Sequence, residues 1–352
     1  MRHPPRCQQK TVPAALLRAP RPALAALLVV TQLLAAACGG PLADDGTGGS
    51  PGDPLKRAAA VPPGLTTDFR AWLATSPYQG DDFPRDDLAG QGSFGGRAST
   101  GQALAHDPVV FIHGNSDCAL CTAVSQTGWS ASRDSFLAHG YSNAELYATT
   151  WGTANLFDTY QQAHSKANVL RTRRFLQAVL AYTGAKKLDV ISHSMGVTLA
   201  RKAILGGRAY DEASGTYYDV GAPLTGAVDA FVGIAGANLG LVDCYLAGPT
   251  TPTCGNGSGL DPGYLFWGAV VGRSTFLNDL LAHPGTEGAY RYSLLSTVDE
   301  VVGYGDLVYG SYTSSLPGQT AGFVYASIPY GHIGLKDKTC DRQLRLVRDH
   351  QP

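Results

Sequence analysis

The chain has 352 residues, 44% of them hydrophobic and 16% charged, so it can build a large core and is not globally disordered. Its formal net charge is −1, but every charged residue among the first 37 is basic, which leaves 22 basic and 28 acidic residues and a net charge of −6 in the remainder. A mildly acidic body gives no electrostatic basis for binding nucleic acid, and we exclude that partner.

The amino terminus has the pattern of an export signal. Arg18 and Arg21 precede an apolar run over residues 23–37 that ends in small side chains. The run is too short for a transmembrane helix of ordinary length. We therefore predict that residues 1–37 are an export signal.

The segment that follows, residues 38–64, is rich in Gly, Pro and Asp, which is the composition of a solvated tether. The stretch Ala35–Cys38 is similar to a bacterial lipobox, in which the cysteine becomes lipidated, although the usual leucine lies one place early, at Leu34. Cleavage after Ala37 is equally allowed by the small residues there. Two localisations stay open, a secreted protein and a cell-surface or outer-membrane lipoprotein tethered to the membrane through a lipidated Cys38.

Residues 65–352 are expected to form one domain, because short apolar runs alternate with helical patterns, as in a mainly parallel sheet with helices on both faces. The predicted strands are Val109–Ile112, Leu146–Ala148, Leu188–Ile191, Val228–Ile234, Tyr290–Leu295 and Phe323–Ser327. The predicted helices are Ser165–Thr183, stopped by Gly184, and Val197–Ile204. The first helix carries three arginines that we expect on a solvated face, namely Arg171, Arg173 and Arg174.

A candidate nucleophile lies between the third predicted strand and the helix after it. Ser192–Gly196 has the strand–turn–helix context of a nucleophile elbow. This strained turn requires small residues two places before and two places after its serine, and Ser192 and Gly196 meet that requirement. We predict that Ser194 is the nucleophile of a serine hydrolase.

A serine hydroxyl is a weak nucleophile, so it needs an oxyanion hole and a general base. The loop Ile112–Asn115 follows the first predicted strand and can aim the Asn115 N–H at a developing oxyanion. The residue after the nucleophile, Met195, supplies the second backbone donor. We expect His113 to be structural, since the base comes last in chain order in this kind of site.

The acid and the base should follow the nucleophile in the order Asp, His. Asp299 comes just beyond the fifth predicted strand, where catalytic loops lie in open α/β sheets, and Asp306 is its competitor. His332 follows the last predicted strand, and the only later histidine, His350, lies two residues from the chain end. We predict that Asp299 orients His332, whose Nε2 accepts the proton of Ser194.

Taken together, these pieces resemble the class 2 lipases and the related extracellular depolymerases of polyhydroxyalkanoates. The resemblance rests on Asp107–Asn115, Ser192–Gly196, Ser296–Val302 and Tyr330–Leu335, and it spans roughly Phe69 to Leu335. It implies an α/β-hydrolase fold and a carboxylic ester hydrolase that works through an acyl-enzyme intermediate without a cofactor or metal. The main departure from the family pattern is Ser192, where glycine is commoner.

Several alternatives for substrate and function stay open. The ester could belong to a lipid, met at an interface, or to a polyester at a polymer surface, as in a depolymerase, because one site chemistry serves many esters. From a different class of function, the chain could be a surface binding protein without activity.

The cysteines fit an exported protein. Cys244 and Cys254 bracket a loop that contains two prolines, and we expect them to form a disulfide. Cys118 and Cys121 could be half of a zinc site, but no second pair stands at ligand spacing. The pairing of Cys118, Cys121 and Cys340 stays open.

A long insertion, residues 236–289, separates the fourth and fifth predicted strands. In the resembled fold such an insertion commonly forms a cap over the site. We expect its apolar residues, led by Phe266 and Trp267, to line the acyl side of a cleft. The alternative is that they pack into the main core.

Overall fold

The computed structural model describes residues 63–351. The predicted export signal, Cys38 and nearly all of the predicted tether lie outside these residues. Within the described part, Gly64, the last residue of the predicted tether, pairs with Phe94 in the central sheet.

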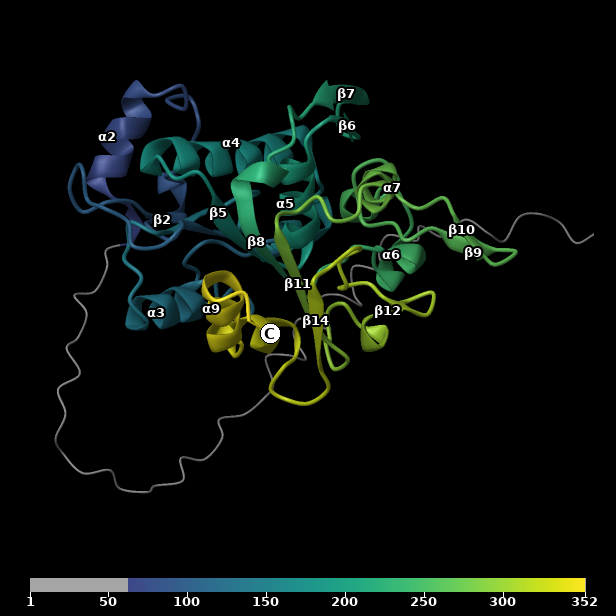
Figure 1. The fold of residues 1–352 in the computed structure, drawn as a ribbon. Helices are drawn as coiled ribbons and strands as arrows, with labels where there is room; N and C mark the ends of the chain where they lie inside the picture. The colour runs from purple at the N-terminus through teal and green to yellow at the C-terminus, as the bar shows by residue number, and fades with distance from the viewer. Residues whose placement is uncertain (1–62, 352) are drawn as a thin grey trace, which may run out of the picture.

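An eight-stranded sheet forms the centre of the molecule (Figure 1). Its order is β1–β2–β4–β3–β5–β8–β11–β14; the strands from β4 to β14 run parallel, whereas β2 is antiparallel to β4. The strands are β1 (Gly64–Leu65), β2 (Ser93–Gly95), β3 (Val109–Ile112), β4 (Leu146–Thr149), β5 (Leu188–His193), β8 (Val228–Ile234), β11 (Tyr290–Ser296) and β14 (Ala321–Tyr325). All six predicted strands are present, and only the last is shifted, by two residues.

Helices cover both faces of the sheet, as predicted, and each face has its own apolar core (Figure 1). One face carries α2 (Thr67–Thr75), α4 (Lys166–Thr183), α5 (Met195–Leu205) and α7 (Thr275–Ala282). The other carries α3 (Ser130–Ala138), α8 (His332–Asp337) and α9 (Cys340–Arg348). The ends of α4 follow from its caps: the Ser165 side chain accepts the Asn168 N–H, and Gly184 adopts the left-handed conformation, with φ 71°.

The arginines of α4 correct one sequence prediction. Arg173 is buried, and its guanidinium donates hydrogen bonds to the carbonyl oxygens of Ala203 and Ala222. The prediction of a fully solvated face is therefore wrong at this residue. A backbone carbonyl near the end of α5 and another in the loop after β7 satisfy the buried charge, and sequence periodicity contains no information about such acceptors.

Three short hairpins and one short helix complete the regular structure around the sheet. The hairpins are β6 (Arg208–Asp211) with β7 (Thr216–Asp219), β9 (Tyr264–Phe266) with β10 (Ala269–Val271), and β12 (Leu307–Val308) with β13 (Ser311–Tyr312). The short helix α6 (Val242–Ala247) lies in the insertion. Across residues 63–351 there is no helix whose length and apolar character would let it cross a membrane.

Candidate active site

Ser194 occupies a strained turn between β5 and α5, with φ 55° and ψ −133°. The turn brings strand and helix so close that a Cβ atom on Gly196 would lie 2.2 Å from the His113 carbonyl oxygen. Ser192 fits the position that is usually glycine because it is fully buried and its hydroxyl donates to the Val232 carbonyl oxygen at 3.3 Å. The local geometry is that of the predicted elbow.

A histidine and an aspartate meet at the carboxyl end of the sheet. His332 is the first residue of α8, and its Nδ1 lies 2.8 Å from Asp299 Oδ2, with both side chains buried. The other carboxylate oxygen, Oδ1, accepts the N–H groups of Val301 at 2.9 Å and Val302 at 2.7 Å. Because a carboxylate accepts hydrogen bonds, Nδ1 carries the proton, and Nε2 is then the unprotonated nitrogen of the neutral His332 ring.

The competing carboxylate, Asp306, has a different partner. It is buried and accepts both the backbone N–H of Ser314, at 3.2 Å, and the Ser314 hydroxyl. Burial raises the pKa of Asp306 to about 7. The structure thus pairs His332 with Asp299 and ties Asp306 to Ser314.

Opposing effects act on the imidazole of His332. Burial disfavours the charged ring and lowers its pKa, but the charge of Asp299, the hydrogen bond to it and the charge of Glu300 together outweigh burial. The net result is a pKa of His332 raised above the ordinary value of 6.5.

Two residues that the sequence prediction did not include hold the backbone of His332. Glu300 Oε2 accepts the His332 N–H at 3.0 Å, and His193 Nε2 donates to the His332 carbonyl oxygen at 3.1 Å. Burial, followed by the nearby charge of His332, lowers the pKa of His193 well below its ordinary value, so this ring is neutral. The only sequence signal for these two residues was their position: Glu300 follows Asp299, and His193 precedes Ser194.

The predicted oxyanion donors lie next to the serine. A Cβ atom on Gly114 would lie 2.8 Å from Ser194 Cβ, so the loop passes directly against Ser194. The backbone N–H groups of Asn115 and Met195 have no hydrogen-bond partner among residues 63–351, and both residues line the same cleft as Ser194. The Asn115 side chain is fixed separately, by a bond to the Thr159 carbonyl oxygen at 2.9 Å.

His113 has the structural role that its place in the chain indicated. The Trp151 backbone N–H donates to His113 Nε2 at 3.1 Å, and the Trp151 indole donates to the His113 carbonyl oxygen at 2.8 Å. The proton therefore resides on Nδ1, which donates to the Gly114 carbonyl oxygen at 2.7 Å. Burial lowers the pKa of His113 to about 3, so the ring is neutral and serves as a fixed support under the loop.

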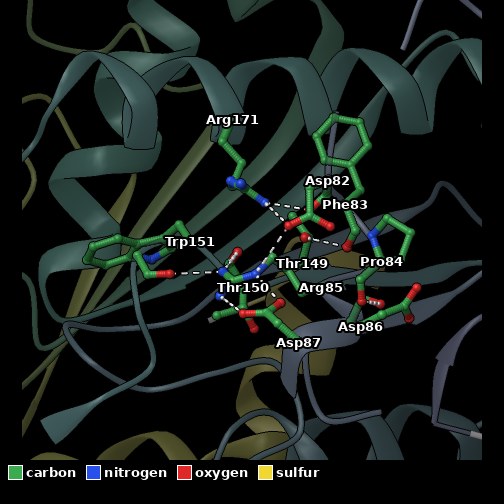
Figure 2. A network of polar contacts seen from close by, with 12 residues as sticks. Asp82, Phe83, Pro84, Arg85, Asp86, Asp87, Thr149, Thr150, Trp151 and Arg171 are labelled. Carbon is green, nitrogen blue, oxygen red and sulfur yellow. Dashed lines mark hydrogen bonds and ion pairs between the residues drawn. The ribbon is translucent and has the colours of Figure 1, made fainter. Parts of the chain in front are cut away.

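A polar network around Arg85 holds the backbone on either side of Trp151 (Figure 2). The buried guanidinium of Arg85 donates to the carbonyl oxygens of Thr150 at 3.0 Å and Gly152 at 2.9 Å, and it forms a two-point ion pair with Asp87. Residues on both sides of Trp151 are therefore anchored to the segment 82–87. The network fixes the backbone on both sides of Trp151, whose N–H in turn holds the His113 ring.

These residues open into one cleft of about 970 Å³, which contains Ser194, Asp299 and His332. The cleft has mostly apolar walls. They come from the loop 114–125, the 3₁₀ helix η3 (Leu156–Gln161), the insertion, and the loops 297–305 and 328–334. The insertion supplies the apolar residues Leu241, Leu246, Ala247 and Leu260.

Phe266 and Trp267 do not line this cleft, which corrects the sequence expectation. They lie at the tip of the β9–β10 hairpin, with exposed fractions of 58% and 94%, and Figure 1 shows this hairpin projecting from the body. The alternative of core packing is equally wrong for this pair. Apolar content predicts burial, but it does not show that a two-stranded hairpin will carry these side chains outward.

Two disulfides flank the cleft. The expected Cys244–Cys254 bridge is present, and Cys118 pairs with Cys121 just after the loop Ile112–Asn115, the predicted oxyanion loop. Cys340 is the free cysteine of the described residues. Among residues 63–351 there is no group of His, Cys, Asp or Glu side chains that could hold a metal ion.

A sequence model of the lipase family (class 2) matches residues 106–345. The chain belongs to the class 2 lipases. As a class 2 lipase it is an α/β-hydrolase of the lipase and esterase type, and the predicted fold class is confirmed.

Solved structures of hydrolases are similar to this class 2 lipase at low identity. Lipase B from Aspergillus fumigatus is 14% identical over 73% of this chain and 55% of that one, with a TM-score of 0.45, so the present chain spans about half of that protein. An esterase from the hyperthermophilic archaeon Pyrobaculum calidifontis is 15% identical over 72% and 79% of the two chains, with a TM-score of 0.43. Mouse alpha/beta hydrolase domain-containing protein 10 is 16% identical over 73% and 91%, with a TM-score of 0.39.

Proposed function

We propose that this class 2 lipase hydrolyses carboxylic esters through Ser194 as nucleophile, His332 as general base and acid, and Asp299 as the group that orients His332. One observation carries the proposal: a strained elbow serine and a buried His–Asp pair share a single cleft. The Asp299 contact fixes the tautomer in which Nε2 of His332 can accept a proton.

The reaction is an acyl transfer in two halves. Ser194 Oγ attacks the ester carbonyl carbon while His332 Nε2 takes the hydroxyl proton, and the N–H groups of Asn115 and Met195 stabilise the oxyanion. The bond to the leaving alcohol breaks as His332 returns the proton to that alcohol, which leaves an acyl-enzyme. Water then attacks the acyl carbon with His332 again as base, and the carboxylic acid departs as Ser194 recovers its proton.

The described contacts include no hydrogen bond between Ser194 and His332. Catalytic hydrogen bonds are often long before substrate binds and tighten in the reacting complex. We therefore expect substrate entry to align the two side chains within the cleft.

The lipase family match favours lipid esters and gives no support to a polyester depolymerase. The mostly apolar cleft of about 970 Å³ suits a substrate with a long or bulky acyl group. We propose that residues 236–289 act as a cap, because Leu241, Leu246 and Leu260 form part of the cleft wall.

We also propose that the substrate is met at an apolar interface. Four consecutive residues of the β9–β10 hairpin, Tyr264–Trp267, each expose half or more of their surface. The Tyr309 hydroxyl bonds to the carbonyl oxygen of Gly263, and the Tyr304 hydroxyl bonds to Asp243 in the cleft wall at 3.3 Å. One loop thus connects the hairpin base to the cleft, and a contiguous exposed apolar surface beside a site is typical of docking.

The proposal includes export. Residues 1–37 act as the export signal, residues 38–64 as the tether, and residues 65–352 as the catalytic domain. The protein is then secreted or held at a membrane surface by a lipidated Cys38. Two disulfides in the described part support an oxidising compartment.

Labelling with a fluorophosphonate probe tests the nucleophile and separates a hydrolase from a silent binding protein. The wild-type protein should be labelled, and Ser194→Ala should abolish both labelling and ester hydrolysis. Ser192→Ala is the matched control, because this neighbouring serine is buried and should leave labelling intact. Full turnover by the Ser194→Ala protein would overturn the assignment.

A further inference from the structure

Lys336 is a buried lysine whose position the mechanism above does not use. It lies one helical turn after His332 in α8 and is fully buried. Its Nζ donates to Thr127 Oγ1 at 2.8 Å, to Asp337 Oδ1 at 2.6 Å and to the Gly128 carbonyl oxygen. An ammonium group has three N–H donors, and each of them has an acceptor here.

Further hydrogen bonds link Gly128, through Asp117, to the predicted oxyanion loop. The Gly128 N–H donates to Asp117 Oδ1 at 3.1 Å, and the same oxygen accepts the Cys118 N–H at 2.8 Å. No side chain fits at Gly128, where a Cβ atom would lie 2.7 Å from the Ala119 carbonyl oxygen. Asp117 stands two residues after Asn115 and lines the cleft, so a short chain of contacts joins α8 to the oxyanion loop.

Burying the Lys336 ammonium costs free energy. Its desolvation is costly, and well-packed apolar side chains of similar volume are often at least as stabilising as buried ionic groups. Its nearest carboxylate, Asp337, is partly exposed, and the contacts with Thr127 and Gly128 come from a loop more than 200 residues earlier in the chain. The arrangement therefore favours a role in geometry over one in stability alone.

We propose that Lys336 is a positioning residue for ester hydrolysis, which holds the start of α8, and with it His332, at a fixed distance from the oxyanion loop through Gly128 and Asp117. The inference rests on the proposed roles of His332 and Asn115. Because the base must reach both the nucleophile and the leaving alcohol, a small shift of α8 relative to the loop lowers the rate of the chemical steps.

The charge of Lys336 provides a second, independent signature. The titratable groups that act on the His332 ring are Asp299, Glu300, Asp306 and Lys336, and the neutral His193 ring lies 4.5 Å from it, centroid to centroid. Asp299 and Glu300 raise the pKa of His332, whereas the Lys336 charge lowers it. Removing that charge should therefore raise the pKa of His332 further and move the acid limb of activity to higher pH.

The test compares Lys336→Met and Lys336→Gln with the wild-type protein on a soluble short-chain ester across pH. We expect kcat to fall roughly tenfold or more in both variants, with KM nearly unchanged, because positioning affects the chemical step. The acid midpoint of kcat/KM should also move to higher pH. Lys338→Met is the matched control, since this exposed lysine ends the same helix and should leave both quantities unchanged.

Thr127→Val separates the effect of the Lys336 hydrogen bonds from the effect of the Lys336 charge. It also covers the case in which the lysine variants do not fold. It removes one acceptor but leaves the ammonium in place, so kcat should fall with no movement of the acid midpoint. Wild-type kcat in Thr127→Val, or wild-type kcat and midpoint in a folded Lys336→Met protein, would overturn the inference. Failure of the proposed function is distinguishable, because wild-type protein would then not react with fluorophosphonate at Ser194.

Discussion

His332 is the residue whose protonation should set the acid limit of activity. In the proposed mechanism only the neutral ring accepts the Ser194 proton, and Asp299 holds the pKa of His332 above its ordinary value of about 6.5. Activity should therefore fall as pH decreases, with a midpoint of kcat/KM above 6.5. Initial rates on a soluble ester between pH 5 and 9 measure this midpoint, and a value below 6.5 would contradict the assignment.

The choice between the two carboxylates can be tested one residue at a time. Asp299→Asn should reduce the rate by roughly 10⁴-fold, because the amide stabilises the wrong imidazole tautomer. Asp306→Asn should cost little in rate, since its partner is Ser314 and not His332. Steady-state kinetics of both variants give the ranking, and the reverse order would show that Asp306 is the functional acid.

At the scale of elements, the proposed docking role of the β9–β10 hairpin can be tested separately from the chemistry. A Phe266→Ser, Trp267→Ser double variant should adsorb more weakly to a triglyceride emulsion and lose activity on it. Each aromatic side chain buries about 150–250 Å² when it docks, at roughly 25 cal/mol per Å². Hydrolysis of a soluble acetate or butyrate ester should be unaffected, because neither residue lines the cleft.

Tyr217→Ser is the matched control for the hairpin variant. This tyrosine is 57% exposed on a different hairpin, β6–β7, so its loss should not affect emulsion binding. Equal losses on soluble and emulsified esters in the double variant would instead show that Phe266 and Trp267 act on the fold or on the cleft.

The elements also show what the sequence could and could not predict. Strand β3 is a continuous apolar run, and β5 and β8 are mostly apolar apart from Asp189 and Asp229; all three are almost entirely buried, so their existence was visible in the sequence. Strands β1 and β2 have two and three residues, which is too short for any periodic pattern. They form only because the sheet offers an edge at β4, and that information is tertiary.

For the whole molecule, buried neutral histidines predict loss of stability in acid. Burial lowers the pKa of His113 to about 3 and the pKa of His164 to about 4, and it keeps the pKa of His193 well below its ordinary value. Below about pH 6.5 these histidines bind protons in the unfolded chain, whereas in the native protein they stay neutral to lower pH. Each such histidine then removes up to about 1.4 kcal/mol of unfolding free energy per pH unit.

His332 acts in the opposite direction. Its raised pKa contributes stability that is present below pH 6.5 and is lost as pH rises through the folded value. Asp306, with a pKa of about 7, and the buried Asp117 and Asp189, whose pKa values burial raises, act in the same direction as His332. The histidine contribution is therefore tested by comparison: on going from pH 7 to pH 5, the urea midpoint of His164→Gln should fall by less, or rise by more, than that of the wild-type protein, and an identical pH dependence would contradict the prediction. His139→Gln, at an exposed site, serves as the control and should leave the pH dependence unchanged.

The candidate site was predictable only where a motif fixes the chain locally. The elbow around Ser194 is such a motif, and the order of acid and base pointed to Asp299 and His332. Glu300 and Lys336 act through contacts with His332 and with a distant loop, which no spacing in the sequence reveals. Lys336 shares a helix face with His332 by its four-residue separation, but its acceptors at Thr127 and Gly128 become apparent only in the fold.

Both sulfur bridges enclose short stretches of chain, with separations of 3 and 10 residues, and both border the cleft without crossing the sheet. Bridges over such short loops remove little chain entropy, so the framework can form before any oxidation takes place. Recombinant protein made in a reducing cytoplasm should therefore be obtained in good yield with native far-UV circular dichroism but low specific activity. Air or glutathione oxidation of that purified material should restore turnover without a refolding step, which makes yield a poor guide to quality for this enzyme.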